Sequence, residues 1–169
     1  VKEINPEFSS QIVLHKSKVP IFDQYYNIEE QIQKALKAKV WLKSGGHLII
    51  EHTEAMVVID VNSGRFIGKK NHEENSLKIN LEAAIEIIKQ LKLRDIGGLI
   101  VIDFIDLEKE VNRKKVYDAL KRAIKIDGSK ASLSEFSNFG LLQMTRQRVG
   151  LSLLYTLTNK CNVCYGTGR

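Results

Sequence analysis

The stretches Ala55-Met56-Val57-Val58-Ile59-Asp60 and Gly98-Leu99-Ile100-Val101-Ile102-Asp103 decide the predicted fold. Each is a short apolar run, rich in β-branched residues, that ends in an aspartate. Such runs are typical of strands covered on both faces, as the parallel strands of α/β sheets usually are. Open α/β sheets bind their ligands beyond the carboxyl ends of the strands, so Asp60 and Asp103 are candidate site residues.

A helical pattern joins the two predicted strands. Strand, helix and strand form a crossover unit, which brings both strand ends to one edge of the sheet. Two carboxylates that meet there repel each other unless a cation neutralises them, so we predict a divalent metal ion between Asp60 and Asp103. The alternative is that each aspartate only caps the turn after its strand. The helical apolar positions are Leu77, Leu81, Ala84, Ile85, Ile88 and Leu91.

The rest of the chain predicts an α/β fold, a mixed sheet with flanking helices. A glycine pair in the sequence Ser44-Gly45-Gly46 is typical of a hairpin turn, and three successive strands there form a meander. The other expected elements are helices at 28–39, 110–125 and 151–157 and strands at 40–43, 47–51, 131–140 and 141–149.

The composition favours a nucleic-acid partner over a membrane or exported protein. The chain has 169 residues, and 26 Lys and Arg against 20 Asp and Glu give a net charge of +6, which favours a polyanionic partner such as nucleic acid. Apolar runs fall well short of the roughly 18 residues that span a bilayer. The first residues lack a signal-peptide core, and a start at valine suggests an excised piece.

The only two cysteines, Cys161 and Cys164, form a C-x-x-C motif near the end of the chain. A redox pair, half of a zinc site and coincidence are the alternatives. The glycines that follow oppose the helix of a thioredoxin-type motif and favour a metal-binding turn. A structural zinc ion needs four ligands, so the other two would come from histidines or from the same motif in a second copy of the chain.

Several longer stretches carry a family resemblance. They are residues 42–46 (LKSGG), 51–55 (EHTEA), 59–64 (IDVNSG), 80–84 (NLEAA), 90–98 (QLKLRDIGG), 102–106 (IDFID), 139–148 (FGLLQMTRQR) and the terminal C-x-x-C-x-G-x-G. From about Val40 onward the chain resembles the catalytic core of the ribonuclease E/G family. Residues 66–71 (FIGKKN) resemble the ribonuclease G branch more than the E branch.

The resemblance implies a domain organisation. Residues 40–150 would form a deoxyribonuclease I-like catalytic subdomain, and residues 151–169 a zinc-link. Residues 1–39 would be a lead-in with one helix, the end of an upstream region. The RNA-binding barrel and the 5′-monophosphate pocket of full-length members are not recognisable, so we expect a fragment of a larger nuclease.

The resemblance also implies site residues. Asp60 and Asp103 would hold a catalytic Mg2+, and Asn62 would support Asp60 as a further catalytic residue. Cys161 and Cys164 would share one Zn2+ with the same pair of a second copy, which makes the zinc-linked dimer a partner. Asn162 departs from the family, which usually has proline there.

The implied function is a Mg2+-dependent endoribonuclease that cleaves single-stranded RNA in RNA processing and decay and leaves 5′-phosphate ends. Rival interpretations are a non-catalytic, zinc-linked dimerisation and RNA-docking module, and a deoxyribonuclease or phosphodiesterase. Asp106 either supports the metal site or caps the next helix. Reduced thiols and the missing signal favour the cytoplasm, and a plastid stroma also fits. The expected phosphate contacts are Lys69, Lys70, Lys130, Arg146 and Arg148.

Overall fold

The computed structural model describes residues 11–12, 14–16, 18, 20, 27–64 and 72–166. The chain divides into two compact units, Val1–Lys34 and Ala35–Arg169. The helix predicted in the lead-in is confirmed as α2, Ile28–Leu36. The predicted divisions after residues 39 and 150 stay predictions. No helix in the described part of the chain has the length and apolar character needed to cross a membrane.

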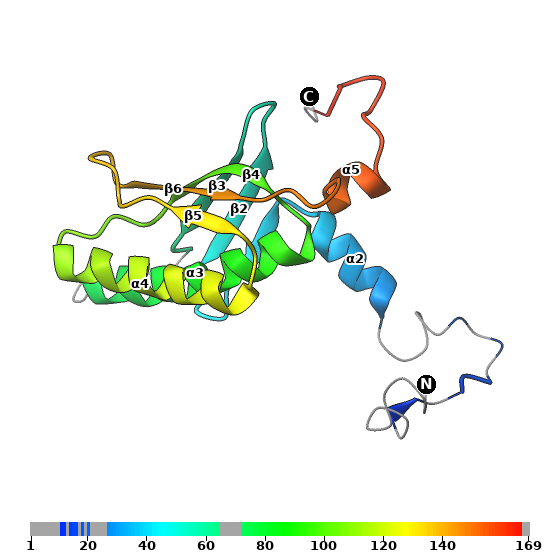
Figure 1. Ribbon diagram of the computed structural model, residues 1–169, viewed down its shortest axis with the longest axis horizontal. Coiled ribbons are helices and arrows are strands. Elements are labelled where there is room, and N and C mark those ends of the chain that lie inside the picture. The colour runs from blue at the N-terminus through cyan, green and yellow to red at the C-terminus, as the bar shows by residue number, and fades with distance from the viewer. Residues whose placement is uncertain are drawn as a thin grey trace. The chain divides into compact units, whose positions relative to one another are not determined.

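A six-stranded mixed sheet forms the centre of the second unit (Figure 1). Strands β3 and β4 are parallel, and the other pairs in the described sheet are antiparallel. The predicted α/β class and the three-strand meander are therefore confirmed, and the architecture is consistent with a nuclease-like fold. In spatial order the strands are β1 (Lys39–Trp41), β2 (His47–His52), β3 (Val57–Asn62), β4 (Gly98–Asp103), β6 (Leu141–Arg146) and β5 (Ala131–Leu133).

Two long helices cover one side of the sheet. Helix α3 (His72–Leu93) is the predicted crossover between β3 and β4, and helix α4 (Glu110–Asp127) follows β4 (Figure 1). Alternate residues of the strands point toward these helices and make one contiguous core. A short helix, α5 (Leu153–Leu157), follows the sheet. Side chains with almost no exposed surface include Leu48, Ile59, Ile100, Ile102 and Leu142 from strands and Ile87, Leu91, Val116 and Leu120 from helices.

The opposite face of the sheet is open at several described positions. Leu99 keeps 38% of its surface exposed, and Asp60, Asp103, Gln143 and Thr145 are exposed on the same face. The expectation that β3 and β4 are covered on both faces is therefore wrong for the described residues. The apolar runs looked continuous because half-buried valines occupy the open face between fully buried residues.

The predicted strands 131–140 and 141–149 are shorter than expected. Strand β5 ends at Leu133, and residues 134–140 form a connection that is stabilised by serine hydroxyls. The Ser137 hydroxyl accepts the backbone N–H groups of Phe139 at 3.3 Å and Leu141 at 3.2 Å. These side-chain bonds replace ladder hydrogen bonds, which is why the strand stops early.

Helix α3 also supplies the cap for the start of α4. The carboxylate of Glu73 accepts the backbone N–H groups of Glu108 at 3.0 Å and Lys109 at 3.2 Å, and the side-chain amide of Asn112 at 2.7 Å. The hydrogen bond from Asn112, followed by the one from Glu108, lowers the pKa of Glu73. A carboxylate at a helix N-terminus is favourable, so this contact holds the starts of both helices at one end of the sheet.

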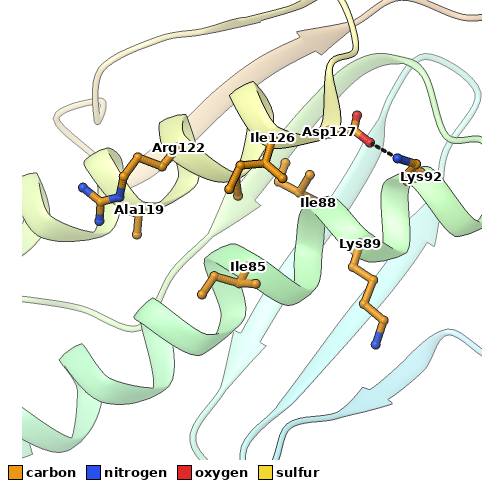
Figure 2. Close-up of a pocket in the computed structure, with 9 residues that line it drawn as sticks. Ile85, Ile88, Lys89, Lys92, Ala119, Arg122, Ile126 and Asp127 are labelled. Atoms are coloured by element: carbon orange, nitrogen blue, oxygen red, sulfur yellow. Dashed lines mark ion pairs between the residues drawn. The ribbon is translucent and has the colours of Figure 1, made fainter.

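A groove of about 420 Å³ runs between α3 and α4. Figure 2 shows its isoleucines and, at one end, the ion pair between Lys92 and Asp127, whose closest atoms are 3.4 Å apart. Ile85 and Ile126 are exposed to 61% and 86%. All described lining residues come from these two helices, so the groove is separate from the open face that carries the aspartates.

Candidate active site

Asp60 and Asp103 lie directly opposite each other on the parallel strands β3 and β4. Both side chains are exposed, on the open face of the sheet. The predicted juxtaposition is confirmed. Asp103 ends its strand as expected, whereas β3 continues for two residues beyond Asp60, to Asn62.

Asn62 holds the carboxylate of Asp60. Its side-chain amide donates a hydrogen bond of 2.7 Å to Oδ2 of Asp60. Residues two apart on a strand point to the same face, so the β3 backbone itself places this amide beside the carboxylate. The bond restricts the orientation of Asp60, in agreement with the supporting role that the family resemblance implies for Asn62.

The site concentrates negative charge. Burial, then the charge of Asp60 and then that of Asp106, raise the pKa of Asp103. Among the described residues, no group of three or more His, Cys, Asp or Glu side chains is arranged to hold a metal ion. Two carboxylates with waters in the remaining positions suit Mg2+, which keeps several waters when it binds to proteins, so the donor set fits this ion.

The hairpin between β1 and β2 packs against the chain that follows Asp60. A Cβ atom on Gly46 would lie 2.8 Å from the backbone oxygen of Asn62, and one on Gly64 would lie 2.5 Å from that of Gly45. Gly64 also has a φ of +66°. Glycine is therefore required at both positions for this close backbone approach.

Residues 80–84 of α3 hold the two connections that flank the site. Glu82 accepts the backbone N–H groups of Lys43 at 2.6 Å and Ser44 at 3.0 Å. Asn80 donates to the oxygen of Ile105 at 2.7 Å and accepts from its N–H at 3.1 Å. One helix thus positions both the hairpin and the segment after Asp103, which gives a physical reason for the NLEAA motif.

Three further side chains lie on the same face and were missed by sequence reasoning. His47 pairs with Asn62 across β2 and β3, and Trp41 pairs with His47 across β1 and β2. The rings of Trp41 and His47 have centroids 5.2 Å apart, and Nζ of Lys39 lies 4.1 Å from the Trp41 ring. The available signal was the alternation of residues along each hairpin strand. Alternation shows which residues of different strands share a face only once the pairing register is known.

His47 belongs to the electrostatic environment of Asp60. Burial, then the charge of Lys39, lower the pKa of His47, while Asp60 opposes the shift. Nδ1 of His47 is buried and has no hydrogen-bond partner among the described residues. Burial and the charge of Lys39 therefore disfavour the protonated imidazole on this face of the sheet.

The predicted phosphate contacts Lys130, Arg146 and Arg148 lie at the far end of the sheet. Gly98, the first residue of β4, pairs with Arg146, whereas Asp103, the last, pairs with Leu141. A strand of this length spans about 17 Å. These basic residues are thus not beside the aspartates. Lys69 and Lys70 lie outside the described residues.

Arg146 has a structural environment. It is only 9% exposed, and its guanidinium donates to the oxygen of Ile96 at 2.9 Å and to Asp127 Oδ2 at 3.5 Å. Its hydrogen bonds hold β6 to the start of β4 and the end of α4, which argues against Arg146 as a phosphate contact. Arg148 is exposed, and its Nε donates to the oxygen of Gly97 at 3.3 Å.

The C-x-x-C segment forms a turn after α5. Cys161 is exposed and Cys164 is half-buried. The backbone N–H of Tyr165 donates to the oxygen of Cys161 at 2.8 Å, and Tyr165 and Gly166 have φ values of +52° and +95°. Cys161 and Cys164 thus lie within one hydrogen-bonded turn of the described chain.

Comparison with known proteins agrees with this arrangement of motifs. The sequence profile of the Ribonuclease E/G family matches residues 1–149. The chain belongs to the ribonuclease E/G family.

Its relatives include Ribonuclease G of Salmonella typhimurium, 44% identical over 98% of this chain, and Ribonuclease G of Haemophilus influenzae, 45% identical over 99%. The Ribonuclease E/G-like protein, chloroplastic, of Arabidopsis thaliana is 42% identical over 100% of the chain. The chain spans 34% of the length of the two ribonuclease G proteins and 17% of the Arabidopsis protein.

Proposed function

We propose that this chain carries the catalytic centre of a Mg2+-dependent endoribonuclease that cleaves single-stranded RNA during RNA processing and decay. The observation that carries the proposal is the register of β3 and β4, which sets Asp60 against Asp103 with Asn62 bound to Asp60. Membership of the ribonuclease E/G family supports RNA as the substrate. The chain spans about a third of the length of its ribonuclease G relatives, which supports the expectation of a fragment of a larger nuclease.

The chain's own residues prepare the site for a phosphodiester. Asp60 and Asp103 would hold Mg2+, and the amide of Asn62 keeps the Asp60 carboxylate in one orientation. When held by these residues, Mg2+ would supply polarisation of a phosphoryl oxygen and a lowered pKa of a bound water. The open face beside the aspartates carries Trp41, exposed to 66%, with Lys39 above its ring, and this pair would contact a base and its phosphate.

The direct test is cleavage of an end-labelled single-stranded RNA oligonucleotide with Mg2+ or with EDTA. We expect Asp60→Asn and Asp103→Asn each to lower kcat/KM by at least about 100-fold, because each removes a charged metal ligand. The matched control is Asp118→Asn on α4, away from the aspartate pair. Retention of cleavage by both site variants would refute the proposal, and faster cleavage of DNA would favour the deoxyribonuclease alternative.

We further propose that Cys161 and Cys164 share Zn2+ with the same pair of a second copy. The closed turn and the exposed position of Cys161 support this, and the described residues hold no group of three or more His, Cys, Asp or Glu side chains that could complete a metal site. A dimer linked in this way is also what the non-catalytic docking alternative requires. The relatives, bacterial and chloroplastic, favour the cytoplasm or a plastid stroma as the place of action.

A further inference from the structure

A pocket of about 330 Å³ lies immediately beyond Asp103. Its described lining residues come from the β4–α4 connection, the first turn of α4 and the β5–β6 connection. The segment between Asp103 and Asp106 spans three residues, so their Cα atoms are at most about 11 Å apart. Gly140 of the second connection precedes Leu141, which pairs with Asp103. The lining therefore begins next to Asp103 in the chain, and Gly140 on its other side is next to the residue that pairs with Asp103.

The pocket has an aromatic interior and an aromatic rim. Phe104 and Phe136 form the interior, with ring centroids 6.0 Å apart, and Phe104 belongs to the hydrophobic core. Phe139, on the rim, is 88% exposed, and its backbone N–H is held by the Ser137 hydroxyl. An almost fully exposed phenylalanine on a hydrogen-bonded turn presents a flat apolar surface to a ligand.

The charges of the pocket oppose an anionic ligand. Asp106 and Glu108 contribute carboxylates, which accept hydrogen bonds and repel phosphate. The guanidinium of Arg113 already donates to the backbone oxygens of Leu107 at 2.9 Å and Glu108 at 3.2 Å. The described lining thus suits a neutral, flat group with an apolar face and N–H donors at its edge, which is the chemistry of a nucleobase.

We propose that this Phe139 pocket, bounded by Phe104, Asp106, Phe136 and Phe139, holds an unpaired nucleobase of the nucleotide next to the scissile phosphate, stacked on Phe139. The inference rests on the proposed function, because it takes the phosphate at Asp60 and Asp103 as the point of cleavage. Base stacking tolerates all four bases, so the pocket selects for an unpaired base rather than for one sequence.

The test measures RNA binding without cleavage. The full chain is titrated, in EDTA, into a fluorescent single-stranded oligonucleotide and into versions with one abasic nucleotide at each position in turn. For the wild type we expect one abasic position beside the cleavage point to weaken binding about tenfold, since each stacked base contributes strongly to affinity. We expect Phe139→Ala to weaken binding of the intact RNA about tenfold. In this variant, the abasic nucleotide at that position should weaken binding no further. Phe139→Tyr restores the sensitivity.

The control variant is Ile126→Ala, a residue of similar exposure, 86%, at the end of α4. Equal weakening of intact and abasic RNA by Phe139→Ala would overturn the inference, because the ring would then act without a base. Unchanged binding by Phe139→Ala would also overturn it and would favour a protein segment as the occupant. If the proposed function were wrong, the result would differ: RNA binding would still depend on Phe139 as expected, but Mg2+ would not produce cleavage.

Discussion

Single side chains position the backbone around the aspartate pair. One of them is Asn80 of helix α3, which binds the segment after Asp103. Its amide is fully buried and bonds to both backbone polar groups of Ile105. Ile105 follows Asp103 by two residues and lines the Phe139 pocket. Asn80 is therefore a positioning residue, since it acts on the site through the backbone that it binds.

Replacement of Asn80 by alanine leaves the N–H and the oxygen of Ile105 without their partner. We expect Asn80→Ala to lower the free energy of unfolding by about 2 kcal/mol, since each unsatisfied buried group costs about 1–3 kcal/mol. The urea midpoint measures this change, and Lys78→Ala, an exposed residue on the same helix, serves as control. Equal midpoints for the two variants would show that water replaces the amide at no cost.

The β1–β2 hairpin packs closely against the chain at the end of β3, and glycines make this close approach possible. Gly64 and Gly128 both have positive φ, +66° and +72°. A Cβ atom on Gly64 would lie 2.5 Å from the oxygen of Gly45, whereas one on Gly128 would have nothing within 4 Å. A side chain would strain the backbone at both positions, but only at Gly64 would it also meet neighbouring atoms.

Alanine variants of Gly64 and Gly128 therefore separate the cost of a left-handed backbone from the cost of a steric contact. We expect Gly128→Ala to cost about 1 kcal/mol of stability, the usual cost of a left-handed alanine, and to leave cleavage unchanged. Gly64→Ala should cost more and lower RNA cleavage at least tenfold, because the hairpin must move away from the strand that carries Asp60. Thermal unfolding and initial rates measure both effects. Similar losses in the two variants would mean that the hairpin does not support the site.

At the scale of the whole molecule, the proposed zinc-link determines the assembly. Cys161 and Cys164 supply two thiols, and a tetrahedral zinc site needs four ligands. We expect one zinc ion per two chains and the molar mass of a dimer, and we expect Cys161→Ser to lose both. Metal analysis with light scattering measures the two quantities together. A zinc-free monomeric wild type would contradict the shared site.

The sequence alone determined the elements and the central pair of this protein. Apolar runs predicted β3 and β4, and helical spacing predicted α3. Because a crossover helix returns the chain parallel to the first strand, the approach of Asp60 to Asp103 followed from local patterns. The family motifs were also visible in the sequence, since they consist of contiguous residues.

Only the tertiary structure decided which faces and ends of these elements meet. Register placed Lys39, Trp41 and His47 on the same face of the sheet as Asp60, and it placed Arg146 and Arg148 at the opposite end of the sheet. It also showed that Arg146, on the same face of β6 as Leu142 and Met144, is buried and hydrogen-bonded to Ile96 and Asp127. The physical reason is that alternation along one strand shows only which of its residues share a face. Pairing between strands that are distant in the sequence determines which face is covered and which residues lie opposite each other.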